Sequence, residues 1–129
     1  MFRPILFLLA VALALPAWSD DAQVRKMKPQ LGKASIYAKR FAGKKMANGE
    51  RMDPRDDNAA HKTLPLGTRA RVTNLENGRS AIVTIEDRGP YVPGRIVDLS
   101  PGTASQIGLT HKEGVAHVQV QPIELPPRK

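Results

Sequence analysis

Polar and apolar residues alternate along several short stretches of the chain, as they do in half-buried β-strands. The clearest stretches are residues 69–75 and 80–85, in which β-branched residues dominate. The pair Asn77 and Gly78 lies between them, and an Asn-Gly pair supplies the positive φ angles of a tight turn. The pattern therefore predicts a β-hairpin over residues 69–85.

Three more stretches are predicted to form strands. They cover residues 32–37, 95–99 and 114–121, and the last of them alternates most regularly. No long helical segment accompanies them, which excludes a parallel sheet covered by helices. Five or six short strands in a chain of 129 residues favour a small closed β structure, because closure removes exposed edges that would otherwise aggregate. The predicted fold class is mainly β.

Short helical pieces and one loop are predicted between the strands. Ser100 has the properties of an N-cap with Pro101 at the first helical position, so we expect a short helix over residues 103–107. Residues 59–61 are expected to form a single helical turn. Residues 87–94 contain two glycines and two prolines and cannot continue a central strand, because proline donates no ladder hydrogen bond. A loop therefore begins at residue 87.

The N-terminal residues have the pattern of a secretory signal peptide. Arg3 supplies a positive charge, an apolar run covers residues 5–15, and small residues follow at the positions that a signal peptidase reads. The run is too short to span a bilayer, which takes about 20 residues. We expect cleavage after Ser19, with Ala17 as the alternative, and a mature protein that is exported, either periplasmic or secreted.

Changes in composition predict the domain organisation. Residues 1–19 are a signal peptide, residues 20–31 a flexible leader, residues 32–121 the barrel domain and residues 122–129 a basic, proline-rich tail. The chain has no cysteine, so we expect neither disulfides nor a lipid anchor on cysteine. Its net charge of +8 favours polyanions such as an acidic cell wall. Because export would separate the protein from nucleic acid, we expect no nucleic-acid partner.

Six motifs carry a resemblance to a known family. In chain order they are GKASIY at 32–37, ANGE at 47–50, AAHKTLPLGT at 59–68, VTNLENGRS at 72–80, DRGPY at 87–91 and GRIVDLS at 94–100. Together they closely resemble the rare lipoprotein A family of bacteria. The resemblance implies a six-stranded double-psi β-barrel of the barwin and expansin type, with a surface groove and one or two short helices. It also implies an endolytic peptidoglycan lytic transglycosylase that cleaves peptide-free glycan strands and leaves 1,6-anhydro-muramyl ends.

The same resemblance implies a site. Asp87 is the implied catalytic carboxyl, acting first as an acid and then as a base on the 6-hydroxyl of the sugar, with Glu50 as a second catalytic carboxyl. Without the resemblance, Asp87 would be interpreted as an aspartate that caps a turn. Glu86 is expected to be solvated, because adjacent residues of an extended chain point to opposite faces. The residues implied in substrate binding are His61, Tyr37, Asn48, Arg88 and Tyr91.

Several of these assignments have alternatives. His61 either lines the groove or hydrogen-bonds the barrel wall. Tyr37 either stacks on sugar rings or forms part of the core. Arg88 points either toward Asp87, where it would stabilise the carboxylate, or toward Asp98, which we expect to support a loop rather than to react. The sequence leaves each of these choices open.

Other chemistries are excluded by what the sequence lacks. The three histidines have no ligand spacing and cysteine is absent, so we expect no metal, no cofactor and no thiol nucleophile. Phosphate-loop, dinucleotide and serine-elbow fingerprints are also missing. The alternative to an enzyme is a non-catalytic, expansin-like polysaccharide-binding module, because one groove would serve either function. Expected partners are peptidoglycan glycan strands and cell-division or wall-synthesis proteins, with no stable membrane anchor.

Overall fold

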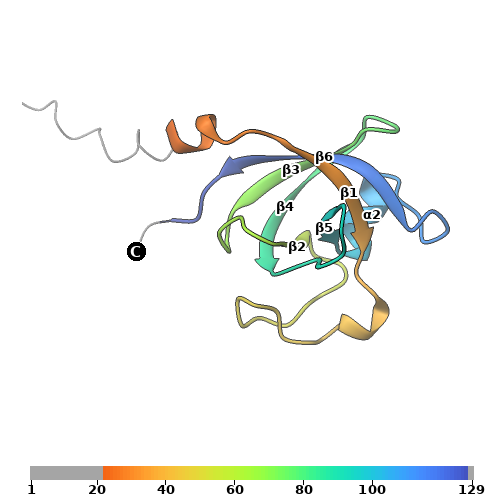
Figure 1. Cartoon of the computed structure of the whole chain (residues 1–129). Coiled ribbons are helices and arrows are strands. Elements are labelled where there is room, and N and C mark those ends of the chain that lie inside the picture. The colour runs from red at the N-terminus through yellow and green to blue at the C-terminus, as the bar shows by residue number, and fades with distance from the viewer. Residues whose placement is uncertain (1–21, 128–129) are drawn as a thin grey trace, which may run out of the picture.

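A computed structural model describes residues 22–127, in which six strands close into a barrel (Figure 1). The predicted signal peptide, residues 1–19, lies outside the described residues. The strands are β1 (Gln30–Ile36), β2 (Asn58–His61), β3 (Arg69–Asn74), β4 (Ser80–Asp87), β5 (Arg95–Leu99) and β6 (Val115–Glu124). Two short helices, η2 (Lys39–Phe41) and α2 (Pro101–Gln106), lie between strands, and residues 22–26 form a further helical turn.

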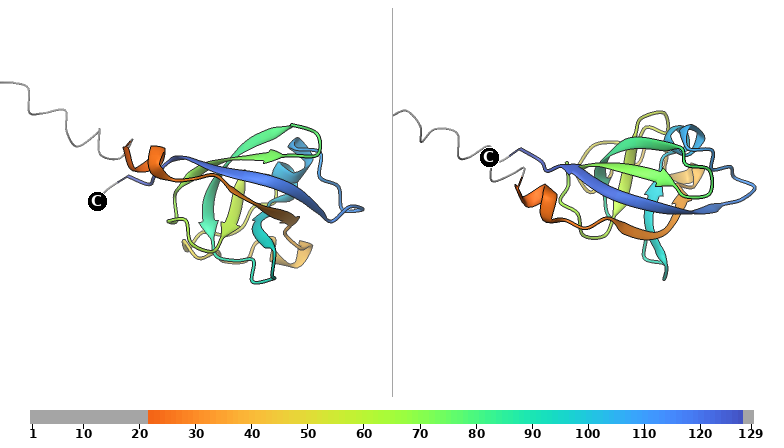
Figure 2. Two further views of the ribbon diagram at one scale, coloured as in Figure 1. Left: turned by 45° about the horizontal axis from the view of Figure 1, so that its top comes forward. Right: turned by 90° about the horizontal axis from the view of Figure 1, so that it is seen from above.

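The strands follow one another around the barrel in the order β1, β5, β2, β4, β3, β6. Only β3 and β4 are both consecutive in the chain and adjacent in the barrel. The pairs β1 with β5 and β2 with β4 are parallel, and the other neighbours are antiparallel. Figure 2 shows the closed barrel from two further directions, with both ends of the described chain leaving it on the same side. The predicted mainly β, six-stranded closed barrel is confirmed.

Side chains at alternate positions of the strands fill the barrel. In β3 and β4 the buried positions recur at every second residue, which is the period that predicted the hairpin. Their burial stabilises the fold by about 25 cal/mol for each Å² of apolar surface removed from water. The largest fully buried apolar side chains include Ile85, Leu99, Ile107, Val72 and Val118. Because Ile85 is among them, the core holds the end of β4 in place, two residues before Asp87.

The structure corrects three local predictions. Residues 59–61 belong to strand β2 and not to a helical turn, because β2 pairs with β4 on one side and β5 on the other. Strand β1 begins at Gln30, inside the predicted leader of residues 20–31. Strand β6 continues to Glu124, so the predicted tail of residues 122–129 also begins too early. In each case hydrogen bonds to neighbouring strands decide the conformation. These bonds cannot be predicted from the sequence of one segment alone.

The connection from β1 to β2 forms a lobe against one end of the barrel. We call residues 38–52 the rim lobe; it contains η2 and a short antiparallel bridge in which Lys45 lies opposite Arg51. Figure 1 shows the rim lobe below the barrel, at the end toward which the arrowheads of β1 and β4 point. A second apolar cluster packs at this junction, formed by Tyr37, Met46, Met52 and Ala60. The rim lobe is therefore anchored on the barrel end where β4 delivers Asp87.

Candidate active site

Asp87 is the last residue of β4, and its half-buried carboxylate accepts three hydrogen bonds. Its Oδ1 accepts from the backbone N–H groups of Ala47 and Arg88, each at 2.9 Å. Its Oδ2 accepts from the hydroxyl of Tyr37 at 2.8 Å. Ala47 of the rim lobe therefore holds the carboxylate on one side, and Tyr37 at the end of β1 holds it on the other. From the sequence, Asp87 was interpreted either as an aspartate that caps a turn or as a catalytic carboxyl.

Tyr37 directly follows β1 and is buried beneath the rim lobe, 6% exposed. Its ring meets the ring of Phe41 edge to face, with centroids 5.8 Å apart. Burial, followed by the hydrogen bond to Asp87, raises the pKa of the Tyr37 phenol far above its ordinary value, so the hydroxyl stays protonated and remains a donor. The structure corrects the prediction that Tyr37 binds substrate: a ring buried to this degree is part of the core, and it acts on the site through Asp87.

Glu86 lies beside Asp87 but is not the solvated residue that strand alternation predicted. Its backbone carbonyl accepts from the N–H of Asn48 at 3.1 Å, and its Oε2 accepts from the side-chain amide of the same residue at 3.2 Å. Burial, and next the charge of the nearby Glu50, raise the pKa of the Glu86 carboxyl. The rim lobe covers both faces of the chain at this point, so Glu86 joins Asp87 and the exposed Glu50 in one carboxyl cluster.

The guanidinium of Arg88 contacts neither Asp87 nor Asp98, the two carboxylates that the sequence left open as its partners. One of its guanidinium nitrogens donates to the backbone carbonyls of His61 and Leu64, at 3.1 and 2.6 Å. Asp98 instead pairs with Arg95 at 2.9 Å and accepts from the hydroxyl of Ser35, which confirms its expected supporting role. The guanidinium of Arg88 therefore fixes the loop after β2 through Nη1. Its role in substrate binding stays a prediction.

His61 is the last residue of β2 and is buried, 3% exposed. Its Nδ1 accepts from the backbone N–H groups of Thr63 and Leu64, both at 3.1 Å. With Nδ1 accepting, Nε2 carries the proton and donates to the side-chain oxygen of Gln30 at 2.9 Å. Both ring nitrogens are thus occupied by the protein. Of the two roles that the sequence left open, the structure has the hydrogen bond to the barrel wall and not the contact with substrate.

The buried His61 makes stability depend on pH. Burial, then the charges of Arg88 and Lys62, lower its pKa below the ordinary 6.5. The unfolded chain therefore binds a proton at pH values where the folded protein does not, so this contribution to stability is complete above pH 6.5 and decreases as the pH falls through that value. We expect the free energy of unfolding, measured by urea denaturation, to decrease between about pH 7.5 and about pH 5. In a His61→Gln variant the dependence should be smaller.

The exposed His111 provides the control for this measurement. A His111→Gln variant loses a histidine without disturbing the loop after β2, and it should keep the pH dependence of the wild type. If the His61→Gln variant kept the same dependence as the wild type, the buried ring would not be its source.

The remaining predicted binding residues lie on exposed loops around Asp87. Asn48 is exposed at the tip of the rim lobe, and Tyr91 is 77% exposed in the loop after β4. Two hollows of the surface lie elsewhere. One of about 640 Å³ covers the outer face of β3 and β4, and one of about 400 Å³ lies beside α2. Asp87 lines neither of them, so the carboxyl cluster lies outside both hollows.

Among residues 22–127, no three or more histidine, aspartate or glutamate side chains are placed to hold a metal ion. None of the helices in this range is long and apolar enough to cross a membrane.

The sequence is similar to several bacterial enzymes with curated names. It is 43% identical to the probable endolytic peptidoglycan transglycosylase RlpA of Synechocystis sp. over 122 residues, covering 95% of this chain and 38% of that protein. It is 52% identical to the endolytic peptidoglycan transglycosylase RlpA of Pasteurella multocida, covering 73% of this chain and 32% of that protein. The chain thus spans about a third of the length of these relatives.

Solved structures with a similar fold have much lower identity. The Streptomyces papain inhibitor has a TM-score of 0.60 at 22% identity, covering 75% of this chain and 96% of the inhibitor. The Clavibacter michiganensis expansin has a TM-score of 0.60 at 17% identity, covering 78% of this chain and 53% of the expansin. The family model described as lytic transglycolase matches residues 30–120, from the first residue of β1 into β6. With its double-psi β-barrel and this match over most of its length, the chain belongs to the lytic transglycolase family.

Proposed function

We propose that the protein is an endolytic peptidoglycan lytic transglycosylase that cleaves peptide-free glycan strands and leaves 1,6-anhydro-muramyl ends. The names of its relatives and its membership of the lytic transglycolase family support the reaction class. The observation that carries the proposal is the position of Asp87, whose carboxylate is held by three donors at an open rim. A carboxyl group fixed in orientation and open on one side is what proton transfer to a polymer requires.

In the proposed reaction Asp87 starts as the carboxylic acid. It gives its proton to the glycosidic oxygen, and the bond between that oxygen and the anomeric carbon breaks. The 6-hydroxyl oxygen of the same sugar then bonds to the anomeric carbon, and Asp87 takes the hydroxyl proton. No water is consumed, and the acid is regenerated. Because Oδ1 is occupied by two backbone donors, Oδ2 is the oxygen that exchanges the proton.

The neighbouring carboxyls have a separate role in this proposal. Positive charge develops on the sugar ring as the bond to the leaving oxygen breaks, and negative charge fixed nearby stabilises it. Glu50 is exposed at the rim, and the half-buried Glu86 is oriented by Asn48. We propose Glu50 as the second catalytic carboxyl, with Glu86 supporting it. Asn48 and Tyr91 remain the proposed contacts with substrate.

The proposal is tested with purified protein and glycan strands from which an amidase has removed the peptides. Mass spectrometry should detect new 1,6-anhydro-muramyl ends. If the protein binds these strands but releases no such product, the expansin-like, non-catalytic alternative is correct. Because the fold is similar to that of an expansin, non-catalytic binding is the alternative that this experiment must distinguish from cleavage.

Tyr37 is proposed as a positioning residue, and a Tyr37→Phe variant tests this. Loss of the hydroxyl removes the hydrogen bond that Oδ2 of Asp87 accepts from Tyr37, so we expect kcat to fall about tenfold with KM little changed, and stability to fall by about 1 kcal/mol. Steady-state kinetics separate the two parameters, and urea denaturation measures the stability. Tyr91→Phe is the matched control for stability, because the hydroxyl it removes is on an exposed ring. An unchanged kcat in Tyr37→Phe would contradict the positioning role.

We also propose the organisation of the chain in the cell. Residues 1–19 would be a signal peptide removed on export to the periplasm or the medium, which their charge and apolar run support. The barrel, with strand ends at Gln30 and Glu124, would then act on the wall directly. Cell-division or wall-synthesis proteins are the proposed protein partners. N-terminal sequencing of protein from the cell envelope tests the cleavage position.

A further inference from the structure

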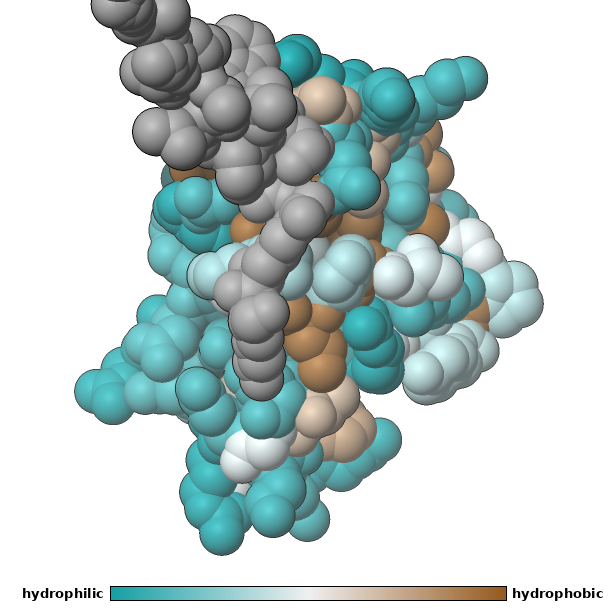
Figure 3. Space-filling model, turned by 90° about the vertical axis from the view of Figure 1, so that its left-hand side faces the viewer, coloured by the Kyte–Doolittle hydropathy of each residue, from teal (hydrophilic) through white to brown (hydrophobic). Residues whose placement is uncertain are grey.

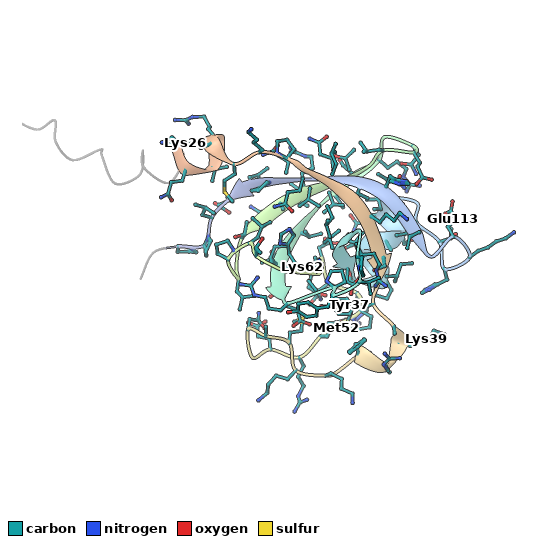
Figure 4. All side chains as sticks on the ribbon, viewed as in Figure 1. Lys26, Tyr37, Lys39, Met52, Lys62 and Glu113 are labelled. Atoms are coloured by element: carbon teal, nitrogen blue, oxygen red, sulfur yellow. The ribbon has the colours of Figure 1, made fainter. Side chains whose placement is uncertain are left out.

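The rim lobe is strongly basic on its outer surface. Among its fifteen residues, numbered 38–52, five are basic and one, Glu50, is acidic. All five basic side chains are exposed. They are Lys39, Arg40, Lys44, Lys45 and Arg51. Figure 4 places Lys39 on the outside of the rim lobe, whereas Tyr37 and Met52 lie between the lobe and the barrel. In Figure 3 the lower end of the molecule, where the rim lobe lies, is mostly hydrophilic.

Within residues 22–127, these charges form no ion pair with a carboxylate. In the part of the chain that the structure describes, the arginines paired with carboxylates are Arg55, Arg69 and Arg95. None of them belongs to the rim lobe. Of the lobe's own bases, Arg51 donates to the backbone carbonyl of Gly43 at 2.9 Å, a contact that leaves its charge uncompensated. The rim lobe therefore presents a concentrated positive charge to the solvent.

Folding does not explain this concentration of charge. Lys45 and Arg51 are directly opposite each other in the bridge of the rim lobe, and like charges at such positions destabilise a strand pair. Met46, which follows Lys45, and Met52, which follows Arg51, are buried and hold the lobe to the barrel. The bases could be replaced by neutral polar residues without loss of this anchor. Their charge is thus explained by something outside the protein.

The basic surface is continuous with the carboxyl cluster. Ala47 and Asn48, which follow Lys45 and Met46, are the residues that contact Asp87 and Glu86. The rim lobe also carries Phe41, 39% exposed, with the guanidinium of Arg40 5.0 Å from its ring centroid. An exposed aromatic face packs against the apolar face of a sugar ring, and cations bind carboxylates. The surface of the rim lobe therefore carries both an aromatic ring that can pack on a sugar and cations that can bind its carboxylates.

We propose that the rim lobe is a binding surface for a polysaccharide that carries carboxylate groups, and that it holds this polymer across the carboxyl cluster. The bases offset the repulsion that Glu50 and Glu86 would exert on an anionic chain. This inference rests on the proposed function, because it specifies the charge of the polymer that reaches Asp87. It assigns binding to the lobe and cleavage to the barrel rim.

The test measures binding of the whole protein to polygalacturonate, which carries one carboxylate on each sugar, with neutral dextran as the reference polymer. A Lys44→Gln, Lys45→Gln, Arg51→Gln triple variant should bind polygalacturonate about tenfold more weakly, since exposed ion pairs each contribute modestly. Wild-type binding should weaken as salt is added. The triple variant should unfold within a few degrees of the wild type, because the loss of the exposed hydrogen bond from Arg51 to Gly43 is offset by the loss of a like-charge pair.

The matched control removes the same charge elsewhere. An Arg25→Gln, Lys26→Gln, Lys28→Gln variant changes three exposed bases ahead of β1. Its affinity for polygalacturonate should stay within about twofold of the wild type, because those bases lie outside the lobe. Equal losses in the two triple variants would mean that net charge alone drives binding and would overturn the proposal. Tighter wild-type binding to inorganic polyphosphate than to polygalacturonate would also overturn it.

Binding and cleavage fail separately in these experiments. If wild-type protein binds polygalacturonate through the rim lobe but cleaves no glycan strand, the proposed reaction is wrong and the binding surface stands. If it cleaves glycan strands while the lobe variant keeps full affinity for polygalacturonate, the reaction stands and the inference about the lobe is wrong.

Discussion

An Asp87→Asn variant should lose cleavage of peptide-free glycan strands by about 10²- to 10⁴-fold, the range over which a positioned acid or base accelerates a reaction. Asparagine has the shape of aspartate but neither gives nor takes a proton at neutral pH. Its side-chain oxygen accepts the two backbone donors, so those contacts persist. Its amide group can only donate, so the hydroxyl of Tyr37 must accept from it and its own O–H loses its acceptor. The measurement is the rate at which 1,6-anhydro ends appear, followed by mass spectrometry.

The control for this variant is Asp56→Asn, which removes an exposed carboxylate from the loop before β2. The Asp56 side chain makes no hydrogen bond to the carboxyl cluster, and its charge is the smallest of the causes that shift the pKa of Glu86. This control should cleave at the wild-type rate. Circular dichroism and urea denaturation should show that Asp87→Asn is folded and about 1–3 kcal/mol less stable than the wild type, because the buried hydroxyl of Tyr37 loses its acceptor. Wild-type activity in Asp87→Asn would show that another group supplies the proton, and Glu50 and Glu86 would be the next carboxyls to replace.

The largest effect on stability is expected from Leu99→Ala. Leu99 is fully buried at the end of β5, between Ile36 of β1 and Ala59 of β2. Truncating it leaves a cavity in the barrel, and such changes cost about 2–5 kcal/mol. For a domain of this size the corresponding fall in Tm is roughly 10–20 °C. Thermal unfolding followed by circular dichroism measures it.

Leu75→Ala is the matched control, because it makes the same chemical change at a side chain that is 50% exposed in the hairpin loop. We expect it to cost less than about 1 kcal/mol. The backbone carbonyl of Leu99 accepts from the N–H of Tyr37 at 2.9 Å, and this bond survives truncation of the side chain. Folded Leu99→Ala protein should therefore keep its activity at low temperature. Equal losses of stability in the two variants would mean that the barrel interior does not dominate the folding energy.

Local patterns in the sequence predicted the elements whose conformation is decided locally. The period of two in residues 69–85 identified β3 and β4 because each strand buries one face, and Gly78 has the positive φ that the turn needs. The helix after Ser100 was also identified, since an N-cap and a proline at N1 act within one turn; the Ser100 side chain accepts from the N–H of Thr103. Strand β2 was missed because all four of its residues are buried, so no alternation marks it.

The candidate site was predicted in part. Asp87 was identified through the motif that contains it, and its exact surroundings were not. Its hydrogen bond with Tyr37 joins residues 50 positions apart, and no pattern within either segment indicates it. Glu86 was misjudged, because strand alternation assumes an open opposite face and the rim lobe covers that face. The five basic residues among residues 38–52 could have indicated that this segment is a surface element close to the site.

The sequence by itself determined that the chain forms a small, closed, mainly β domain, that its surface is basic, and that Asp87 stands where a strand gives way to a loop. Periodicity, charge and turn residues are properties of neighbouring positions, so they can be read without the fold. Only the tertiary structure decided which groups surround that carboxyl, since the barrel order brings the ends of β1 and β4 to one rim. The same closure buried His61 and Tyr37 and directed the bases of the rim lobe outward. Contacts between distant segments arise from how strands pair, and pairing is settled by the packing of the whole core.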